Sequence, residues 1–121
     1  MTTYAVLLPG DEATWESASE EQRAAMYAKH GEFARLLEER GHKVTGGAEL
    51  THSRGAKVVR RSGAGITVTD GPYAETVEQL TGFYTIETDD LDDLLEVVGV
   101  LADGHAVEVR AAVGGADGPT E

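Results

Sequence analysis

The segment from Ser19 to Gly41 constrains the fold most, because it predicts one long helix with both ends marked. Ser19 and Gln22 have the spacing of a capping box, in which each residue satisfies a free amide of the other. Glu20 and Glu21 suit the positive N-terminal end of a helix. Gly41 is expected to end the helix in a left-handed conformation, so we predict about six turns that need a surface to pack on.

The apolar side of this helix contains a histidine. Met26, His30, Phe33 and Leu37 recur at spacings of four, three and four residues, which places them within about 60° of arc. Histidine is the side chain best suited to exchange a proton near neutral pH. His30 is therefore either a core residue bonded to a backbone carbonyl or a tyrosine hydroxyl, or it points into a cleft beside an acidic partner.

Six apolar, β-prone segments surround two helical ones. After the first strand, GDEATWESA indicates a loop or a single helical turn, and a second helix is expected after Thr88 or Asp89. The order β-α-β-(β-β)-β-α-β predicts an α+β fold, a ferredoxin-like split βαβ sheet with both helices on one face. The bare face predicts a homodimer packed sheet to sheet. The strand segments are 3–8, 42–50, 56–61, 65–70, 80–88 and 106–113.

Composition excludes several classes of protein. A chain of 121 residues fits one domain, which we place at 1–113, followed by a flexible C-terminal tail at 114–121. The formal net charge of −12 argues against direct nucleic-acid binding and against an anionic membrane. There are no cysteines, no ligand-like spacing of histidines and no phosphate-binding loop, so we expect no metal and no cofactor. The N-terminus lacks an export signal, which favours the cytoplasm.

The run DGPYAE, residues 70–75, follows a strand and could serve as a turn or as one wall of a site. Asp70 before Gly-Pro readily forms an Asx-turn or caps a short helix, and either use needs only its side-chain oxygen. The alternative is that the turn aims Asp70 at His30. Two other carboxylates, Glu75 and Glu49, remain open as the acidic partner of His30.

Two further groups of residues have alternative roles. Phe83 and Tyr84 are adjacent in a predicted strand, so they lie on opposite faces, and Tyr84 either packs in the core or interface or holds a ligand oxygen. The segment 51–62 carries four Arg and Lys residues and no acid. These charges suit an anionic ligand, an acidic partner, or an edge hairpin that must avoid unwanted strand pairing.

The runs TVTDGPYAETVEQLTGFYTIE, DLDDLLEV and AVEVRAA resemble the DGPF group of the YCII-related family over roughly residues 3–113. Tyr73 stands where that group has Phe, and Val77 where Lys is common. The resemblance implies a ferredoxin-like dimeric α+β barrel. In the wider family a helix histidine paired with an acid has been proposed as a catalytic dyad, and one branch acts as a dehydrochlorinase. His30 precedes Gly41 at the comparable distance, so the resemblance assigns it that role.

Three functions follow as hypotheses. The first is a dimeric protein with a small-molecule pocket that transfers protons, as a lyase or isomerase, with His30 as acid or base and Asp70 orienting it. The second is a non-catalytic module that senses a ligand or partners an extracytoplasmic-function sigma factor, beside whose genes DGPF proteins are often encoded. The third is a structural dimer with a closed cleft. The predicted ligand-binding residues are Trp15, Glu49, Tyr73, Glu75 and Tyr84.

Overall fold

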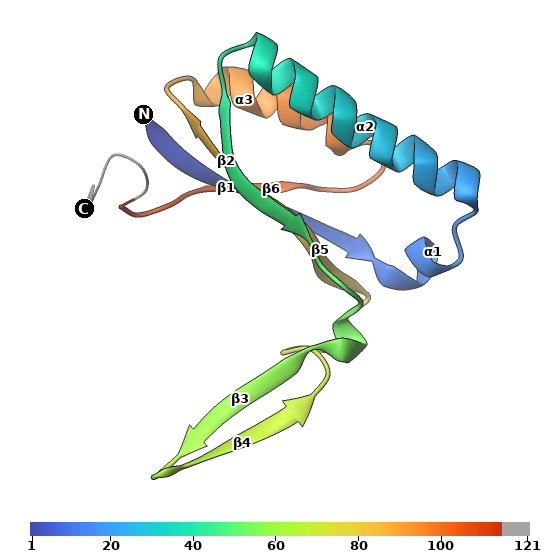
Figure 1. The fold of residues 1–121 in the computed structure, drawn as a ribbon, viewed down its shortest axis with the longest axis vertical. Coiled ribbons are helices and arrows are strands. Elements are labelled where there is room, and N and C mark those ends of the chain that lie inside the picture. Colours follow the sequence, from blue (N-terminus) through green and yellow to red (C-terminus); the bar gives the residue numbers. More distant parts are fainter. Residues whose placement is uncertain (115–121) are drawn as a thin grey trace.

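The computed structural model describes residues 1–114 and shows a mixed α+β fold (Figure 1). The predicted tail at 114–121 lies outside the described residues apart from Gly114. Four strands form the main sheet in the order β2-β5-β1-β6, and every neighbouring pair is antiparallel. Their bounds are Thr2–Asp11 for β1, Lys43–Glu49 for β2, Glu78–Thr88 for β5 and Glu108–Ala111 for β6.

The predicted hairpin forms, but as a separate two-stranded sheet of β3 (Lys57–Ser62) and β4 (Gly65–Asp70). We call this hairpin the arm; Figure 1 shows it extending away from the main sheet. One interpretation of its basic residues was a hairpin at an edge of the main sheet. That interpretation is wrong, because the arm forms a sheet of its own. A 3₁₀ turn, η1 (Ser53–Gly55), redirects the chain after β2, and Glu12 holds that turn by accepting a hydrogen bond from the Ser53 amide at 2.7 Å.

The long helix, α2 (Glu20–Glu39), has the ends that the sequence predicted. The Ser19 hydroxyl accepts from the Gln22 amide at 3.1 Å, and the Gln22 side chain accepts from the Ser19 amide at 2.8 Å, so the capping box is complete. Gly41 has a φ of 81°, the left-handed conformation that ends a helix at little steric cost to glycine.

The shorter helices differ slightly from expectation. The segment before α2 contains a short helix, α1 (Glu12–Glu16), capped by Asp11, which accepts from the amides of the next turn. Helix α3 (Leu91–Val98) is capped by Asp90 and continues into the 3₁₀ turn η2 (Gly99–Leu101). The sequence had placed the helix start at Thr88 or Asp89, whereas the cap is Asp90; Thr88 accepts a hydrogen bond from the Asp90 amide and so stabilises the approach to the helix.

Helices α2 and α3 lie on the same side of the main sheet, as predicted, and enclose the core with it (Figure 1). On the sheet, Val6 and Ile86 are fully buried against Phe33 and Leu37 of α2. On the opposite face, Leu7 of β1 pairs in register with Phe83 of β5. No helix in residues 1–114 is long and apolar enough to cross a membrane.

Candidate functional site

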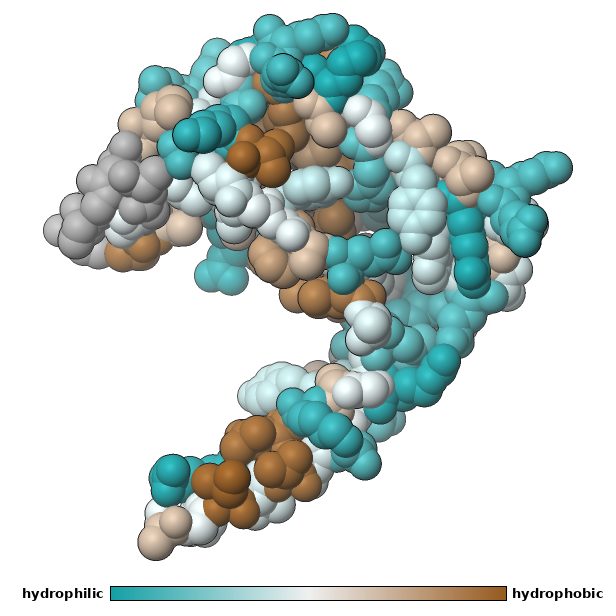
Figure 2. All heavy atoms as spheres, viewed as in Figure 1, coloured by the Kyte–Doolittle hydropathy of each residue, from teal (hydrophilic) through white to brown (hydrophobic). Residues whose placement is uncertain are grey.

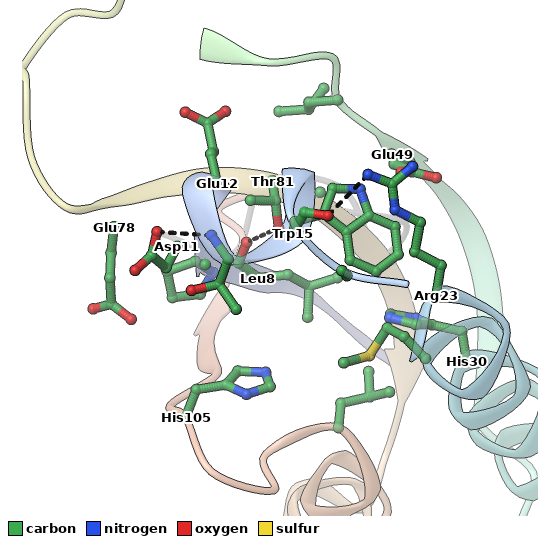
Figure 3. A pocket seen from close by; sticks show the side chains of 18 of the residues that line it. Leu8, Asp11, Glu12, Trp15, Arg23, His30, Glu49, Glu78, Thr81 and His105 are labelled. Carbon is green, nitrogen blue, oxygen red and sulfur yellow. Dashed lines mark hydrogen bonds between the residues drawn. The ribbon is translucent and has the colours of Figure 1, made fainter. Parts of the chain in front are cut away.

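A hollow of about 1090 Å³ lies between the N-terminal half of α2, helix α1 and the ends of β1, β2 and β5 (Figure 3). Its wall combines apolar and aromatic side chains with a few polar groups, which is the usual composition of a small-molecule site. His30 enters it from α2, Trp15 from α1 and Glu49 from the end of β2. The apolar part of the wall includes Leu8, Met26 and Leu101.

Glycine makes the floor of this hollow possible. Gly47 has a φ of 151°, and a Cβ there would lie 2.6 Å from the Phe83 carbonyl oxygen and 3.1 Å from the Cα of Tyr84. Only glycine therefore lets β2 approach β5 closely at this point. A Cβ at Gly47 would also lie 3.3 Å from the Tyr84 ring, so glycine leaves room for that side chain beneath the hollow.

His30 and Tyr84 form the polar centre of the site. His30 Nδ1 lies 2.7 Å from the Tyr84 hydroxyl, and the two rings stack at a centroid distance of 5.9 Å. No residue in 1–114 forms a hydrogen bond with Nε2 of His30. Burial lowers the pKa of His30, outweighing the opposing pull of Glu49, with His105 adding to the decrease. The imidazole is therefore neutral near pH 7, with one nitrogen held and one facing the hollow.

Glu49 is the carboxylate whose charge acts on the pKa of His30. Both of its oxygens lie 3.1 Å from the Tyr27 hydroxyl, which donates to the carboxylate. This hydrogen bond is the main reason that the pKa of Tyr27 is raised. The Tyr27 ring meets Trp15 edge to face at a centroid distance of 5.7 Å, so Glu49 continues an aromatic wall.

Arg23 fixes the position of this aromatic wall. Its guanidinium lies 5.2 Å from the centre of the Trp15 ring, within the range of a cation–π contact. One of its terminal nitrogens donates to the backbone carbonyls of Trp15 and Glu16, at 2.9 and 3.1 Å. Both carbonyls lie at the C-terminal end of α1, and that of Trp15 also accepts from the Ala18 amide at 3.2 Å. Arg23 therefore clamps α1 to α2 over the hollow.

Three of the predicted site residues, Asp70, Tyr73 and Glu75, do not line the hollow that contains His30. Asp70 contacts the Lys57 ammonium on the neighbouring strand of the arm. Asp70 and Glu75 both line a second, more open hollow of about 650 Å³ at the base of the arm. Tyr73 is 86% exposed. Of the predicted site residues, Trp15, Glu49 and Tyr84 line the same hollow as His30 within one chain. The pairing of His30 with Asp70 stays a prediction.

Sequence reasoning missed Arg23 and Tyr27 as site residues. Both lie on α2, seven and three residues before His30, which places them on the same side of the helix. That spacing was the available signal. It was hidden because an arginine and a tyrosine at the edge of an apolar stripe are usually solvated.

A second histidine, His42, is enclosed at the opposite end of α2. Its Nδ1 lies 2.7 Å from the Thr88 hydroxyl and its Nε2 lies 2.7 Å from an oxygen of Asp93. Its side chain is 1% exposed. Asp93 also accepts from Arg40 at 2.9 Å, so His42 links the end of α2 to the start of α3. This bonding occupies both ring nitrogens and indicates a structural role.

The sequence of this chain is similar to known proteins over most of its length. The YCII-related domain matches residues 2–106 of this chain. An uncharacterised protein of Rhizobium meliloti (strain 1021) is 34% identical over 102 residues, which span 84% of this chain and 82% of that relative. Within residues 1–114, no group of three or more histidine and carboxylate side chains is arranged to hold a metal ion. The chain belongs to the YCII-related domain family.

Proposed function

We propose that this protein binds a small organic molecule in the hollow beside α2 and transfers a proton on it, with His30 as the acid–base group. The observation that carries the proposal is the state of the His30 ring: Nδ1 is anchored by Tyr84, and Nε2 is unbonded within residues 1–114. Its lowered pKa keeps the ring neutral near pH 7, as a general base requires.

The hydrogen bond to Tyr84 supports a specific division of roles. A neutral imidazole carries one N–H, and when this is on Nδ1 it donates to the Tyr84 oxygen and leaves the Nε2 lone pair to accept a proton. Burial raises the pKa of Tyr84, so the phenol stays protonated and its own hydrogen can reach a ligand oxygen. Tyr84 then serves as the electrophile and His30 as the base.

The reaction class follows from these two groups. Nε2 of His30 takes a proton from a carbon next to a carbonyl, and the electron pair moves to the carbonyl oxygen, which Tyr84 stabilises by hydrogen bonding. Returning the proton to another atom completes an isomerisation. Loss of a leaving group from the adjacent carbon completes an elimination, the lyase outcome. The aromatic wall of Trp15 and Tyr27 favours a ligand with a flat apolar portion.

We further propose that Glu49 is the acid that acts on His30 in one chain, because it lines the same hollow and its charge raises the pKa of His30. Replacing Glu49 by Gln should lower the pKa of His30 further, as followed by NMR of the ring protons. Asp70→Asn is the matched control, and it should leave the titration of His30 unmoved. A shift caused by Asp70→Asn alone would instead assign the role to Asp70, supplied by a second subunit.

The function is proposed for a dimer of the DGPF type. Helix α2 joins β1 to β2, which run parallel with β5 between them, and α3 joins β5 to β6 across β1 in the same manner. This supports a ferredoxin-like split βαβ arrangement. The uncovered sheet face, with Leu7 opposite Phe83, supports pairing with a second copy into a dimeric α+β barrel.

The proposal can be tested with a panel of small aromatic ketones. Trp15 is the only tryptophan, so its fluorescence should report binding. In D₂O the protein should then accelerate exchange of the proton next to the carbonyl. His30→Ala should still bind but lose about 10²–10⁴-fold in exchange rate. Binding without any exchange in the natural protein would support the ligand-sensing alternative, including a regulatory partner of a sigma factor.

A further inference from the structure

The arm is a hairpin without a partner in its own chain. Its two strands pair only with each other, and every residue of β4 is exposed. Its backbone is closed at the base by the Gly71 amide, which donates to the Ala56 carbonyl at 2.8 Å. An isolated two-stranded hairpin is at best marginally stable in water. A hairpin of this kind needs a surface that covers one of its faces.

One face of the arm is apolar. Val59 pairs directly with Val68, and Ile66 lies on the same face opposite Arg61. These three apolar side chains are 60%, 53% and 60% exposed for Val59, Val68 and Ile66. Figure 2 shows a hydrophobic patch on the arm. The opposite face is mainly polar, with Thr67 and Thr69 along β4.

The charge of the arm identifies a matching partner. Between residues 53 and 70 there are four Arg and Lys residues and one acid, Asp70, whereas the whole chain has 10 Lys and Arg against 22 Asp and Glu. The rest of the chain is therefore strongly acidic. Arg54 and Lys57 are paired with Glu16 and Asp70 of the same chain, and Arg60 and Arg61 form no ion pair within residues 1–114. A second copy of this chain therefore offers the arm a surface of opposite charge.

We propose that the arm docks on a second copy of this chain through its Val59, Ile66 and Val68 face, each copy giving its arm to the other. A twofold dimer makes this contact twice. The inference rests on the dimer proposed above and names the element that holds it together. A partner outside the family, or a nucleic acid attracted by the basic side chains, is the competing occupant.

The base of the arm also connects this contact to the candidate site. The Ser53 amide donates to Glu12, and Arg54 donates to Glu16 at 2.7 Å, both on α1. Helix α1 carries Trp15, which forms a wall of the hollow. An arm held by a second copy therefore also holds η1 and α1, and with them Trp15, in place.

The test compares two substitutions on adjacent residues of β4. Val68→Asp places a charge on the apolar face, and Thr67→Asp places the same charge on the opposite face of the same strand. Sedimentation equilibrium should give a dimer for the natural chain at micromolar concentration. Val68→Asp should raise the dimer dissociation constant at least about 100-fold, because the buried contact is lost twice. Thr67→Asp should change it less than about threefold.

A further variant and a folding measurement separate loss of docking from misfolding. Arg61→Glu keeps the strand but reverses a charge on the docking face, and it should weaken the dimer while reducing its sensitivity to salt. Circular dichroism should show native helix content in all variants. A fully dimeric Val68→Asp would overturn the role of the arm but leave the sheet-to-sheet dimer standing. A monomeric natural chain, or equal dissociation by both aspartates, would also overturn it. Failure of proton exchange alone would not affect the arm.

Discussion

His30, in the middle of α2, and His42, just after its C-terminal end, make the same bond and lead to different outcomes. His30 and His42 each place Nδ1 2.7 Å from a hydroxyl of β5, that of Tyr84 or of Thr88. At His42 the second nitrogen is also bonded, to Asp93, and the side chain is enclosed. At His30 the second nitrogen faces the hollow. Of the two rings, only that of His30 has a nitrogen without a hydrogen-bond partner in residues 1–114, which is what the proposed proton transfer requires.

The sharpest test of this comparison is to remove each ring. His42→Ala should lower the free energy of unfolding by about 2–4 kcal/mol, because it leaves a buried cavity and removes the hydrogen bonds to Thr88 and Asp93. His30→Ala should cost less than about 1 kcal/mol, since solvent in the hollow can satisfy Tyr84. Urea unfolding measures both. Equal losses would show that His30 is a core residue like His42.

Removing the hydroxyls should give a smaller contrast in the same direction. Thr88→Val leaves buried Nδ1 of His42 without a partner, which costs about 1–3 kcal/mol. Tyr84→Phe should cost under about 1 kcal/mol in stability, but it should remove the exchange activity proposed above. Thermal unfolding and the exchange assay separate the two effects. A stable and active Tyr84→Phe variant would contradict the electrophile assigned to Tyr84.

The smallest effect concerns pH at the enclosed end. The hydrogen bond from His42, with help from Arg40, lowers the pKa of Asp93 below its ordinary value of 3.8. The folded state therefore favours the charged carboxylate. This stability is fully present above the unfolded pKa and is lost as pH falls through the folded pKa. Urea midpoints measured from pH 7 down to 3 should decline less steeply for Asp93→Asn. Parallel curves would show that Asp93 contributes no pH dependence.

Local signals in the sequence predicted much of the fold, and long-range ones were not available. The capping box at Ser19 and the terminator at Gly41 depend on residues close in the chain, so pattern reasoning located them. The direction of the arm depends on Glu12 holding Ser53, 41 residues away. No periodicity or turn signal encodes that contact, so the hairpin was expected at the edge of the main sheet.

In the candidate site, too, the residues with local signals were predicted from the sequence and those that depend on long-range packing were not. His30 was identified because a histidine in an apolar stripe is conspicuous, and a tyrosine hydroxyl was one of its anticipated partners. Asp70 was selected for its unusual turn, which is a local feature, whereas Glu49 lies at an ordinary strand end. Only the packing of α2 against β2 shows that Tyr27 reaches Glu49.

Both histidines depend on the pairing register of β5, because each contacts a hydroxyl of that strand. Tyr84 and Thr88 are four residues apart, so they point to the same face of the sheet. A slip of one residue in the pairing of β5 would turn both hydroxyls to the other face. Both histidines would then lose their partners at once. One error in the pairing of β5 would therefore disrupt the candidate site and the enclosed His42 together.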